Sequence, residues 1–466
     1  MKLWSYLRAA FGTTLNIVLY GLTLGHYLWL EGRVSGGIFH NWDHNFRYRP
    51  RRFARPKTEE ELAELIRNST ELRLYGAGHS FNDGVVADDT LISLDDYSGV
   101  AWTDLAAKRM AFKGGTRVRD VVRLMLAEGL AFKAQPSHDA QSIGGILSTD
   151  VHGTGRDWGF VSEAVAGLRV IDAAGNVHDC APGDDLFRAA VGGVGAAGVI
   201  SQVTIQAVER FNVEQKVAMS TRAYVRANLD QLIAENDHVS FYIYPFTEKC
   251  QINTWNRTDK PQSTLGPLRE YLSISSDALL AAWFGGFMAY TGLLRTWSDW
   301  AYGFKRGTDL VLESSEAYTR TIYHMHQELE FTVPFEQTWA ACDEFVGLYE
   351  SMYDSNTPYA LFEVRFTPAG RFNSFIGAGR ERRSTWLDLV PNDSLGFERY
   401  YDAAQIHMKQ TPYDTRPHLG KFCTLFHKDD MERLHGENFD RFRAVCQQQD
   451  PGRKFANSFT RRLFWD

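Results

Sequence analysis

Three short segments rich in glycine and other small residues constrain the fold of this chain more than any other feature. They are GAGHSFNDG at 76–84, SIGGILSTDVHGTG at 142–155 and GGVGAAGVI at 192–200. Residues without bulk let backbone N–H groups approach a ligand closely and form a nest for phosphate oxygens. A compact phosphate needs one such loop, so three loops from separate places indicate an extended dinucleotide. None has the GxGxxG strand-turn-helix fingerprint, which argues against a Rossmann fold.

Two histidines lie in these loops, His79 in the first and His152 in the second. A histidine in a loop is usually a solvated ring or one held by a structural hydrogen bond, and the GAGHS turn alone does not exclude that interpretation. The two rings could also bind a metal ion, but a third ligand at a suitable spacing is missing. We therefore predict no metal site.

Composition limits the choice of partners. The chain has 466 residues, of which 44% are hydrophobic, and this length favours two domains. Its net charge of -7 gives no electrostatic reason to expect a nucleic acid partner, because phosphate backbones are bound by clustered lysine and arginine. The five cysteines are far apart and none has CxxC spacing, so we expect buried thiols and neither a disulfide framework nor a zinc site.

The N-terminus contains an apolar stretch at 11–30 without a formal charge. A helix needs roughly 20 apolar residues to cross a bilayer, so residues 1–35 form a predicted hydrophobic segment and membrane anchor. A cleaved signal peptide and a buried helix are the alternatives. Lys2 and Arg8 precede the stretch, and the positive-inside rule then places the downstream domain in the cytoplasm.

A second uncharged apolar stretch lies at 278–294 and is followed by Trp297, Trp300 and Tyr302. It is short for a membrane span, and aromatic flanks suit a segment that rests on a membrane surface. A core helix is the alternative interpretation.

The predicted elements alternate between helices and strands. Residues 58–67, with Thr58 and Glu61 at capping-box spacing, predict an amphipathic helix, and 116–130 predict a second helix with Thr116 as its cap. Strands are predicted before the first loop at Leu72 and Leu74 and at 91–96, 109–116, 239–246 and 326–334, with a hairpin at 169–180 and an alternating strand through Ile200, Val203 and Ile205. One α+β domain closes near residue 210, and a separate sheet follows.

Several motifs in order resemble a known family. GAGHS after a strand, SIGG with TDVHGTG, and GVGAAGVIS before a strand resemble the FAD domain of vanillyl-alcohol-oxidase-type flavoproteins. FEVRFTPAG at 362–370, RPHLGK at 416–421 and DPGRKFANSF at 450–459 resemble the sugar-1,4-lactone oxidases, which include L-gulonolactone oxidase, D-arabinono-1,4-lactone oxidase and alditol oxidase. The resemblance covers roughly residues 40–466.

The resemblance implies an α+β fold of two parts. A two-subdomain PCMH-type FAD-binding domain is expected at 40–210, and a substrate or cap domain with an antiparallel sheet and flanking helices at 211–400. The C-terminal segment 401–466 would pack back on the FAD domain. Membrane-bound lactone oxidases carry an apolar, aromatic-rich insertion in the cap, which 278–304 resembles.

The resemblance also assigns cofactor residues. It implies a covalent bond between His79 and the 8α-methyl group of FAD. The other cofactor-binding residues that it implies are Gly76, Ala77, Gly78, Ser80, Ser142, Ile143, Gly144, Gly145, Ser148, Thr149, His152, Gly153, Val199, Ile200 and Lys421.

The candidate catalytic residues are Glu363, Arg365 and Lys421. Glu363 and Arg365 stand two positions apart in a strand, so both side chains emerge on one face. Arg365 can stabilise a developing alkoxide and the anionic reduced flavin, because a guanidinium stays charged. Glu363 can orient Arg365 and accept a substrate hydroxyl, and Lys421 would add a positive charge beside flavin N1 and C2. Without the flanking motifs, a solvated strand pair would be the preferred interpretation.

Two departures from the family pattern concern the substrate pocket. Alditol oxidases carry an additional active-site histidine on the strand after Glu-x-Arg, whereas RRSTWLDLV at 382–390 has none. Trp386 or Asp388 would take that space. Lactone oxidases commonly read His-Trp before the small residue and lysine, and this chain reads His418-Leu419-Gly420-Lys421.

The predicted function is FAD-dependent oxidation of a CH–OH group of a sugar lactone or related polyol by hydride transfer to flavin N5. Oxygen is the expected acceptor, because Gly144 could be the small residue over flavin C4a that admits it in this family. The alternatives are a membrane-associated dehydrogenase that passes electrons to quinone or cytochrome, and a non-catalytic flavoprotein used for binding or assembly.

Overall fold

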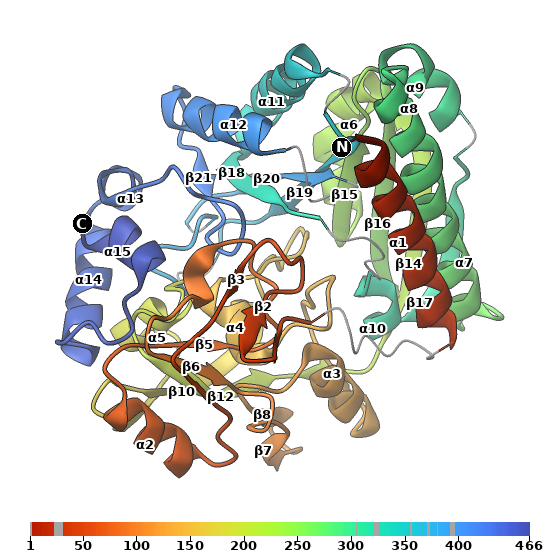
Figure 1. Cartoon of the computed structure of the whole chain (residues 1–466). Helices are drawn as coiled ribbons and strands as arrows, with labels where there is room; N and C mark the ends of the chain where they lie inside the picture. The colour runs from red at the N-terminus through yellow and green to blue at the C-terminus, as the bar shows by residue number, and fades with distance from the viewer. Residues whose placement is uncertain are drawn as a thin grey trace.

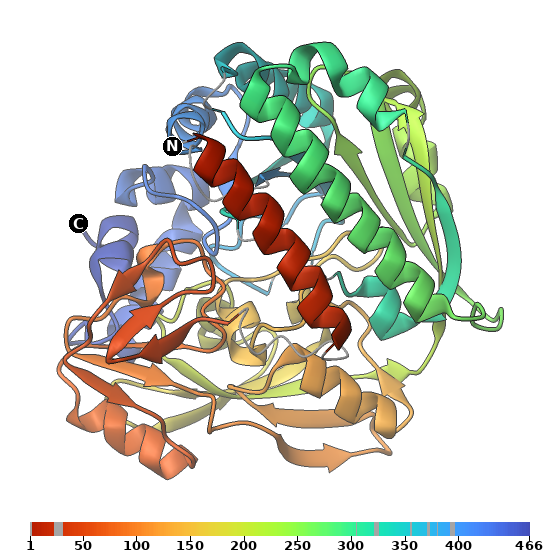
Figure 2. The ribbon, with the colours of Figure 1, turned by 45° about the vertical axis from the view of Figure 1, so that its right-hand side comes forward.

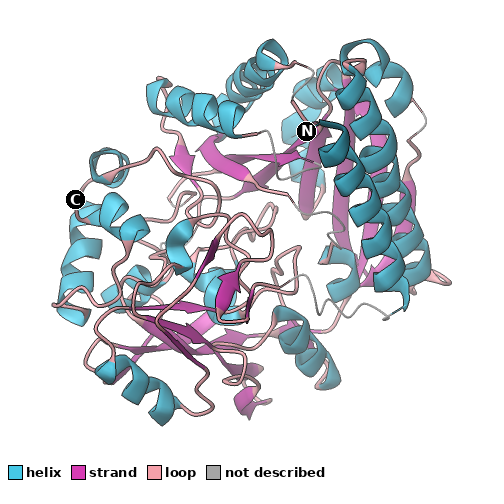
Figure 3. Cartoon of the chain, viewed as in Figure 1, coloured by secondary structure: helices cyan, strands magenta, loops and turns pink. Residues whose placement is uncertain are grey.

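The computed structural model describes residues 2–22, 31–303, 305–320, 326–354, 357–370, 373–379, 381–391 and 397–466. The chain folds into two lobes that face each other (Figure 1). The first lobe is built mainly from residues between 31 and 209, and the second contains the largest sheet. Helices lie around both sets of strands (Figure 3). The mixed α and β class predicted from the sequence is confirmed.

The first lobe contains a small parallel sheet that ends at the first glycine loop. Its order is β4 (Arg52–Ala54), β6 (Thr90–Ser93) and β5 (Leu72–Tyr75). Helix α2 (Glu59–Asn68) covers it, and Thr58 Oγ1 accepts the N–H of Glu61 at 3.2 Å. The Glu61 carboxylate accepts from Lys57 N rather than from Thr58 N, so only half of the predicted capping box forms.

A five-stranded antiparallel sheet completes the core of the first lobe. Its order is β11 (Val177–Cys180), β10 (Val165–Ile171), β12 (Val199–Gln206), β8 (Arg109–Lys113) and β7 (Val100–Asp104), and the β10–β11 hairpin is the predicted one. Helix α3 (Val118–Ala127) packs on it, but the predicted cap Thr116 is wrong. Thr116 donates to the Lys113 carbonyl at 2.6 Å, and Arg117 takes the N-cap position.

Shorter elements join these sheets. They are β1 (Arg33–Ser35), β2 (Ile38–His40), β3 (Arg47–Tyr48), β9 (Leu130–Ala131), β13 (Val208–Glu209), α4 (Ile143–Ser148) and α5 (Asp185–Ala190). The five cysteines are buried and free, as predicted.

The second lobe contains an eight-stranded antiparallel sheet. Its order is β17 (Thr308–Glu313), β14 (Asn212–Thr221), β16 (Lys249–Thr258), β15 (His238–Ile243), β19 (Ala360–Thr367), β20 (Ser384–Pro391), β18 (Leu329–Pro334) and β21 (Arg416–Pro417). Apolar side chains of one face form the largest core cluster with α6 (Arg222–Glu235), α11 (Thr338–Met352) and α12 (Glu398–Gln410). The opposite, polar face of this sheet is turned toward the first lobe.

The C-terminal helices α13 (Lys428–His435), α14 (Glu437–Gln449) and α15 (Ser458–Phe464) lie beside the first lobe (Figure 1). Leu72 N donates to the Lys454 carbonyl at 3.0 Å, and Asn457 Nδ2 donates to the Asp83 carbonyl at 2.9 Å. Strand β21 belongs to the large sheet, although it lies in the predicted C-terminal segment. The predicted domain boundaries themselves stay predictions.

The N-terminal helix α1 (Lys2–Leu22) lies along a long helical segment made of α7 (Gly266–Leu279), the π-helical turn Leu280–Gly285 and α8 (Gly286–Thr291) (Figure 2). The rings of Tyr6 and Trp283 are 6.2 Å apart, and those of Tyr20 and Tyr271 are 5.6 Å apart, so the helices run antiparallel. Helices α9 (Leu294–Tyr302) and α10 (Ser314–Tyr318) follow. Residues 23–30 of the predicted anchor lie outside the described residues.

Candidate functional site

A cavity of about 240 Å³ lies between the two lobes, and most of the predicted site residues line it. Its wall includes the catalytic candidates Glu363, Arg365 and Lys421. Of the predicted cofactor residues, it includes Gly76, Ala77, Gly78, His79, Ser80, Ser142, Gly144, Gly145, Ser148, Thr149, His152, Val199 and Ile200. Ile143 does not line it, because its side chain packs into the core of the first lobe, and Gly153 lines a second cavity instead.

Close packing explains two glycines of the first loop, Gly76 against the second loop and Gly78 against Gly32. A Cβ on Gly76 would lie 1.8 Å from Ser142 Oγ, and one on Gly78 would lie 2.9 Å from Gly32 Cα. Gly78 also has φ +65°, which disfavours any other residue. Ser142 in turn accepts the N–H of Gly145 at 3.2 Å. The cavity wall at this point is therefore mostly backbone.

A buried arginine that sequence reasoning missed connects the loops from behind. Arg73 donates to the carbonyls of Gly84, Val194 and Phe455, each at 2.6 Å. Burial lowers the pKa of Arg73 to about 10, which leaves the guanidinium charged at neutral pH. This cation lines the cavity beside the first and third loops.

His79 lines the cavity beside Trp42 and His138. The rings of His79 and Trp42 stack with centroids 5.0 Å apart, and His79 Nε2 is 3.2 Å from His138 Nε2. Burial, with the charges of His326 and Lys421, lowers the pKa of His138 to about 3, so its imidazole is neutral. Neither Trp42 nor His138 was predicted as a site residue.

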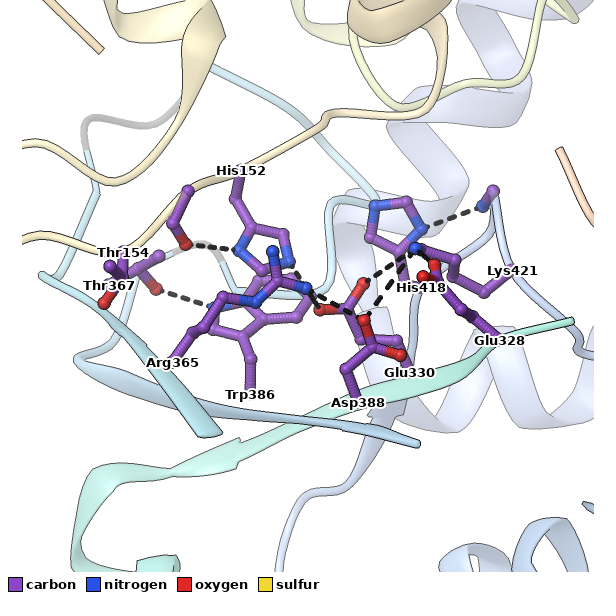
Figure 4. Close-up of polar contacts among 12 residues, drawn as sticks. His152, Thr154, Glu328, Glu330, Arg365, Thr367, Trp386, Asp388, His418 and Lys421 are labelled. Carbon is purple, nitrogen blue, oxygen red and sulfur yellow. Dashed lines mark hydrogen bonds and ion pairs between the residues drawn. The ribbon is translucent and has the colours of Figure 1, made fainter. Parts of the chain in front are cut away.

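Glu363 and Arg365 emerge from β19 on the polar face of the large sheet, as the strand alternation predicted. Arg365 forms an ion pair with the Glu330 carboxylate, and its Nη2 lies 3.2 Å from Asp388 Oδ2 (Figure 4). Asp388 of β20 pairs directly with Glu330 of β18 and with Glu363 of β19. Three carboxyl groups therefore lie in one row across three strands, beside one guanidinium.

The two carboxyl groups that contact Arg365 differ in protonation. Although burial opposes ionisation, Arg365 holds the pKa of Glu330 well below its usual range. Burial, and next the charge of Glu330, raise the pKa of Asp388 well above its usual range. Arg365 therefore favours the ionised form of Glu330, whereas burial and the charge of Glu330 favour the protonated form of Asp388.

Lys421 approaches the same cluster from the C-terminal segment. It forms an ion pair with Glu328, and its Nζ lies 3.9 Å from Glu330 Oε2 and 4.0 Å from Asp388 Oδ2 (Figure 4). Burial lowers the pKa of Lys421 to about 7, while the Glu328 carboxylate favours the charged form.

Trp386 and Asp388, the two residues of 382–390 that the sequence analysis named, both lie on β20. The ring of Trp386 stacks on His152 with centroids 3.6 Å apart, and its Nε1 donates to Thr367 Oγ1 at 3.0 Å. His152 Nε2 lies 3.0 Å from Glu330 Oε1. Trp386 therefore supports His152, whereas Asp388 contacts the catalytic pair.

His152, Glu330 and His418 bring possible metal ligands within 4.8 Å of one another. However, the guanidinium of Arg365 already binds the Glu330 carboxylate, and this positive charge opposes a cation at the same oxygens. We assign no metal to the cluster.

A second cavity of about 60 Å³ adjoins the first at Glu363 and Arg365, which line both. Its remaining wall is aromatic and polar and includes Trp158, His238, Ser240, Trp255, Tyr318 and Arg320. The Glu363–Arg365 pair therefore stands where the two spaces meet.

Glu328 and Glu330 were not predicted as site residues, although their spacing in the sequence could have indicated it. They occupy alternate positions of the strand-like run HQELEFTVP, where carboxylates on one face of an otherwise apolar strand indicate a buried polar site.

Known proteins resemble this chain over most of its length. A sequence model of the family described as D-arabinono-1,4-lactone oxidase matches residues 203–463, and one described as an FAD-binding domain matches 50–181. L-gulono-1,4-lactone dehydrogenase of Mycobacterium tuberculosis is 28% identical over 91% of this chain and 99% of its own length. L-gulonolactone oxidase of Bos taurus is 24% identical over 92% of this chain and 99% of its own length.

Among solved structures, a cholesterol oxidase from B. sterolicum superposes with a TM-score of 0.75 at 16% identity, covering 93% of this chain and 97% of that chain. Fold and site together define an FAD-binding oxidoreductase with a PCMH-type cofactor domain. The chain belongs to the D-arabinono-1,4-lactone oxidase family.

The residues of the large cavity fit FAD. The backbone-lined loops suit a pyrophosphate, and the Arg73 guanidinium adds positive charge there. At the other end, Arg365 Nε and Asp388 Oδ1 are buried and have no hydrogen-bond partner among the described residues. Such groups are expected where a polar ring system binds.

Proposed function

We propose that this chain oxidises a CH–OH group of a sugar-1,4-lactone or a related polyol. The observation that carries the proposal is the position of Glu363 and Arg365, which line both the FAD cavity and the adjoining cavity. A substrate carbinol in the second cavity would lie beside this pair, next to the FAD cavity. The names of the relatives, which act on gulonolactone or arabinonolactone, support the same substrate class.

FAD supplies the hydride acceptor, and the chain supplies orientation and electrostatics. Arg365 stays charged at all relevant pH values, and Glu330 and Asp388 fix its orientation before substrate binds. It can therefore stabilise negative charge on the substrate oxygen as the hydroxyl proton leaves. Glu363 would accept the hydrogen bond of a substrate hydroxyl, and Lys421 would add positive charge to the wall of the FAD cavity.

Anaerobic mixing with sugar lactones and alditols, followed by flavin absorbance, tests this function. Reduction by at least one lactone is expected. Arg365→Lys should slow reduction by roughly 10²–10³-fold, the range found when a single transition-state donor is removed. The matched control is Arg226→Lys, which alters an exposed arginine paired with Asp343 far from the cavity. A flavin that no candidate alcohol reduces would support the non-catalytic alternative.

We further propose that FAD is covalently bound through His79. The location of its ring in the cavity wall and its stacking on Trp42 support this, because they hold an imidazole in place beside the cofactor cavity. Flavin that stays with the acid-precipitated chain, and a mass increment on the peptide that contains His79, are expected. His79→Ala should release the cofactor on denaturation.

Oxygen is the acceptor that we propose, with Gly144 as the small residue that would admit it. Gly144 lines the cavity, which supports this assignment. A dehydrogenase that uses quinone or cytochrome is the second candidate, because one relative is named a dehydrogenase. Hydrogen peroxide formation with lactone would support the oxidase, and turnover only with an artificial acceptor would support the dehydrogenase.

We also propose that the protein associates with a membrane surface, with its catalytic lobes in the cytoplasm. Gly266–Thr291 is a helix long and apolar enough to cross a bilayer, although by length and composition only. Exposed apolar side chains form a stripe on the neighbouring helix α1, at Trp4, Phe11, Leu15, Val18 and Leu22. Paired helices with such side chains suit a position in the plane of the membrane interface.

A further inference from the structure

The ring of His79 is held from two sides. Its face stacks on Trp42 with an interplanar angle of 21°, and its edge meets His138 with centroids 4.3 Å apart at 64°. The two Nε2 atoms are 3.2 Å apart, which is a hydrogen-bond distance. The His79–His138 contact therefore constrains both the position of the His79 ring and which of its nitrogens carries the proton.

A hydrogen bond between two imidazoles requires complementary tautomers. A neutral imidazole has one N–H and one lone pair on the other nitrogen, so one Nε2 must donate and the other accept. When His79 donates from Nε2, its Nδ1 carries the lone pair. When His79 accepts at Nε2, its Nδ1 carries the proton and cannot act as a nucleophile.

The surroundings of His138 keep its ring neutral. Burial is the main cause of its low pKa of about 3, and His326, Lys421 and Arg119 add positive potential. A neutral His138 retains a lone pair that can accept the His79 proton, whereas a protonated one could only donate.

We propose that His138 is a positioning residue for flavin attachment, which accepts the Nε2–H of His79 so that His79 Nδ1 bonds to the flavin 8α carbon. This inference rests on the proposed covalent FAD. It concerns how the bond forms and not whether lactone is oxidised.

The attachment balances as a two-electron oxidation. One C–H bond of the 8α-methyl group and the N–H bond of His79 break, one C–N bond forms, and two protons leave to solvent. The two electrons pass to the flavin ring, and a two-electron acceptor such as dissolved oxygen then removes them. His138 contributes by fixing the tautomer and is not itself consumed.

The test uses the full chain, prepared as apoprotein from riboflavin-starved cells and mixed with FAD in air. Flavin absorbance of the native protein gives total binding, and flavin fluorescence of the denatured chain gives the covalent fraction over time. The variants are His138→Leu, which removes the acceptor, His138→Gln, whose longer amide can still reach His79, and the shorter His138→Asn. His435→Gln is the matched control, because His435 is a buried histidine at the end of helix α13 and does not line the cavity.

Attachment in His138→Leu is expected to be at least ten-fold slower than in the unaltered protein, with FAD still bound. His138→Gln should attach FAD faster than His138→Asn, and His435→Gln should attach FAD at the rate of the unaltered protein. NMR of the isolated flavinyl peptide should show attachment at Nδ1.

Two outcomes would overturn the proposal. One is attachment through His79 Nε2 in the unaltered protein. The other is equal attachment rates in His138→Leu and the unaltered protein or, if His138→Leu binds no FAD, equal rates in His138→Gln and His138→Asn. The proposed function is tested by a separate measurement, the reduction of bound flavin by lactone. That measurement does not depend on the fraction of flavin that is covalently attached.

Discussion

At the scale of single residues, the ion cluster around Arg365 contains more acid than base. Glu330, Asp388 and Glu328 lie near Arg365 and Lys421, and the row adds Glu363. Four carboxyl groups thus stand against two cations, and burying carboxylates that no cation balances is costly. Burial and the charge of Glu330 accordingly raise the pKa of Asp388 well above its usual range. Asp388 already contacts Arg365 and can take over as its ionised partner when Glu330 is neutralised.

This sharing makes a prediction about stability. In Glu330→Gln, the like charge beside Asp388 is gone, so Asp388 should ionise and become the partner of Arg365. In Asp388→Asn, Glu330 remains. Only the double variant removes both carboxyl groups that contact the guanidinium, and breaking a buried pair costs about 3–5 kcal/mol. Urea unfolding of all four proteins should show a double-variant loss well above the sum of the single losses, and additive losses would contradict it.

His418 leads to a prediction about pH. Burial lowers the pKa of His418 to about 4, whereas an unfolded histidine has a pKa of about 6.5. The unfolded chain therefore binds more protons between these values, and stability falls as pH decreases through this window.

His418→Asn removes this titration, and its amide oxygen can still accept the Gly420 N–H that His418 Nδ1 accepts at 3.0 Å. Between pH 6.5 and 4, the unaltered protein should lose about 3 kcal/mol more unfolding free energy than the variant. Urea unfolding at several pH values measures the difference. Parallel curves for the two proteins would show that His418 does not titrate as described.

At the scale of elements, the sequence predicted what lies within one strand but not what lies across strands. The spacing of Glu363 and Arg365 placed both on one face, because side chains alternate along a strand. Asp388 and Glu330 join them through the register β18–β20–β19, and these strands are separated by long connections. No pattern in one sequence fixes such a register, so Glu330 remained unrecognised and Asp388 was only one of two candidates.

The glycine loops show the same limit. Their small residues predicted close backbone approach, but the approach partner of Gly76 is Ser142 from the second loop, a tertiary contact. Ile143 was predicted as a cofactor residue by its place in the motif. Its side chain points into the core because it belongs to the apolar face of α4, which packs on the five-stranded sheet.

Gly76→Ala should disrupt this pair of loops. Its Cβ would lie 1.8 Å from Ser142 Oγ and 2.5 Å from Ser142 Cβ, so the loops must separate. We expect the purified variant to contain little FAD and to bind added FAD at least ten-fold more weakly, measured by flavin fluorescence. The control is Gly153→Ala, whose Cβ has 3.7 Å to its nearest neighbour, the Gln135 carbonyl oxygen, and which should retain FAD. Equal FAD binding by both variants would contradict this account of the loops.

At the scale of the whole molecule, two apolar segments far apart in the sequence form one antiparallel helix pair at the side of the second lobe (Figure 2). Sequence reasoning treated them separately, as an anchor and as a surface segment. The pairing changes the expectation for α1, because Trp283 Nε1 donates to Thr14 Oγ1 at 2.9 Å and Tyr271 donates to the Ile17 carbonyl at 3.0 Å. A helix held in this way lies against the protein.

The stripe on α1 then predicts how the protein meets a bilayer. Phe11 and Leu15 are 60% and 56% exposed, and inserting such a side chain into the interface contributes about 1.5–3 kcal/mol. Phe11→Glu and Leu15→Glu should each lower the partition coefficient onto vesicles of phosphatidylcholine and phosphatidylglycerol about ten-fold or more, measured by flotation. Leu105→Glu is the matched control, because Leu105 is 50% exposed in the first lobe, away from the helix pair. Equal loss in all three variants, or unchanged flotation of the α1 variants, would show that α1 is not the docking surface.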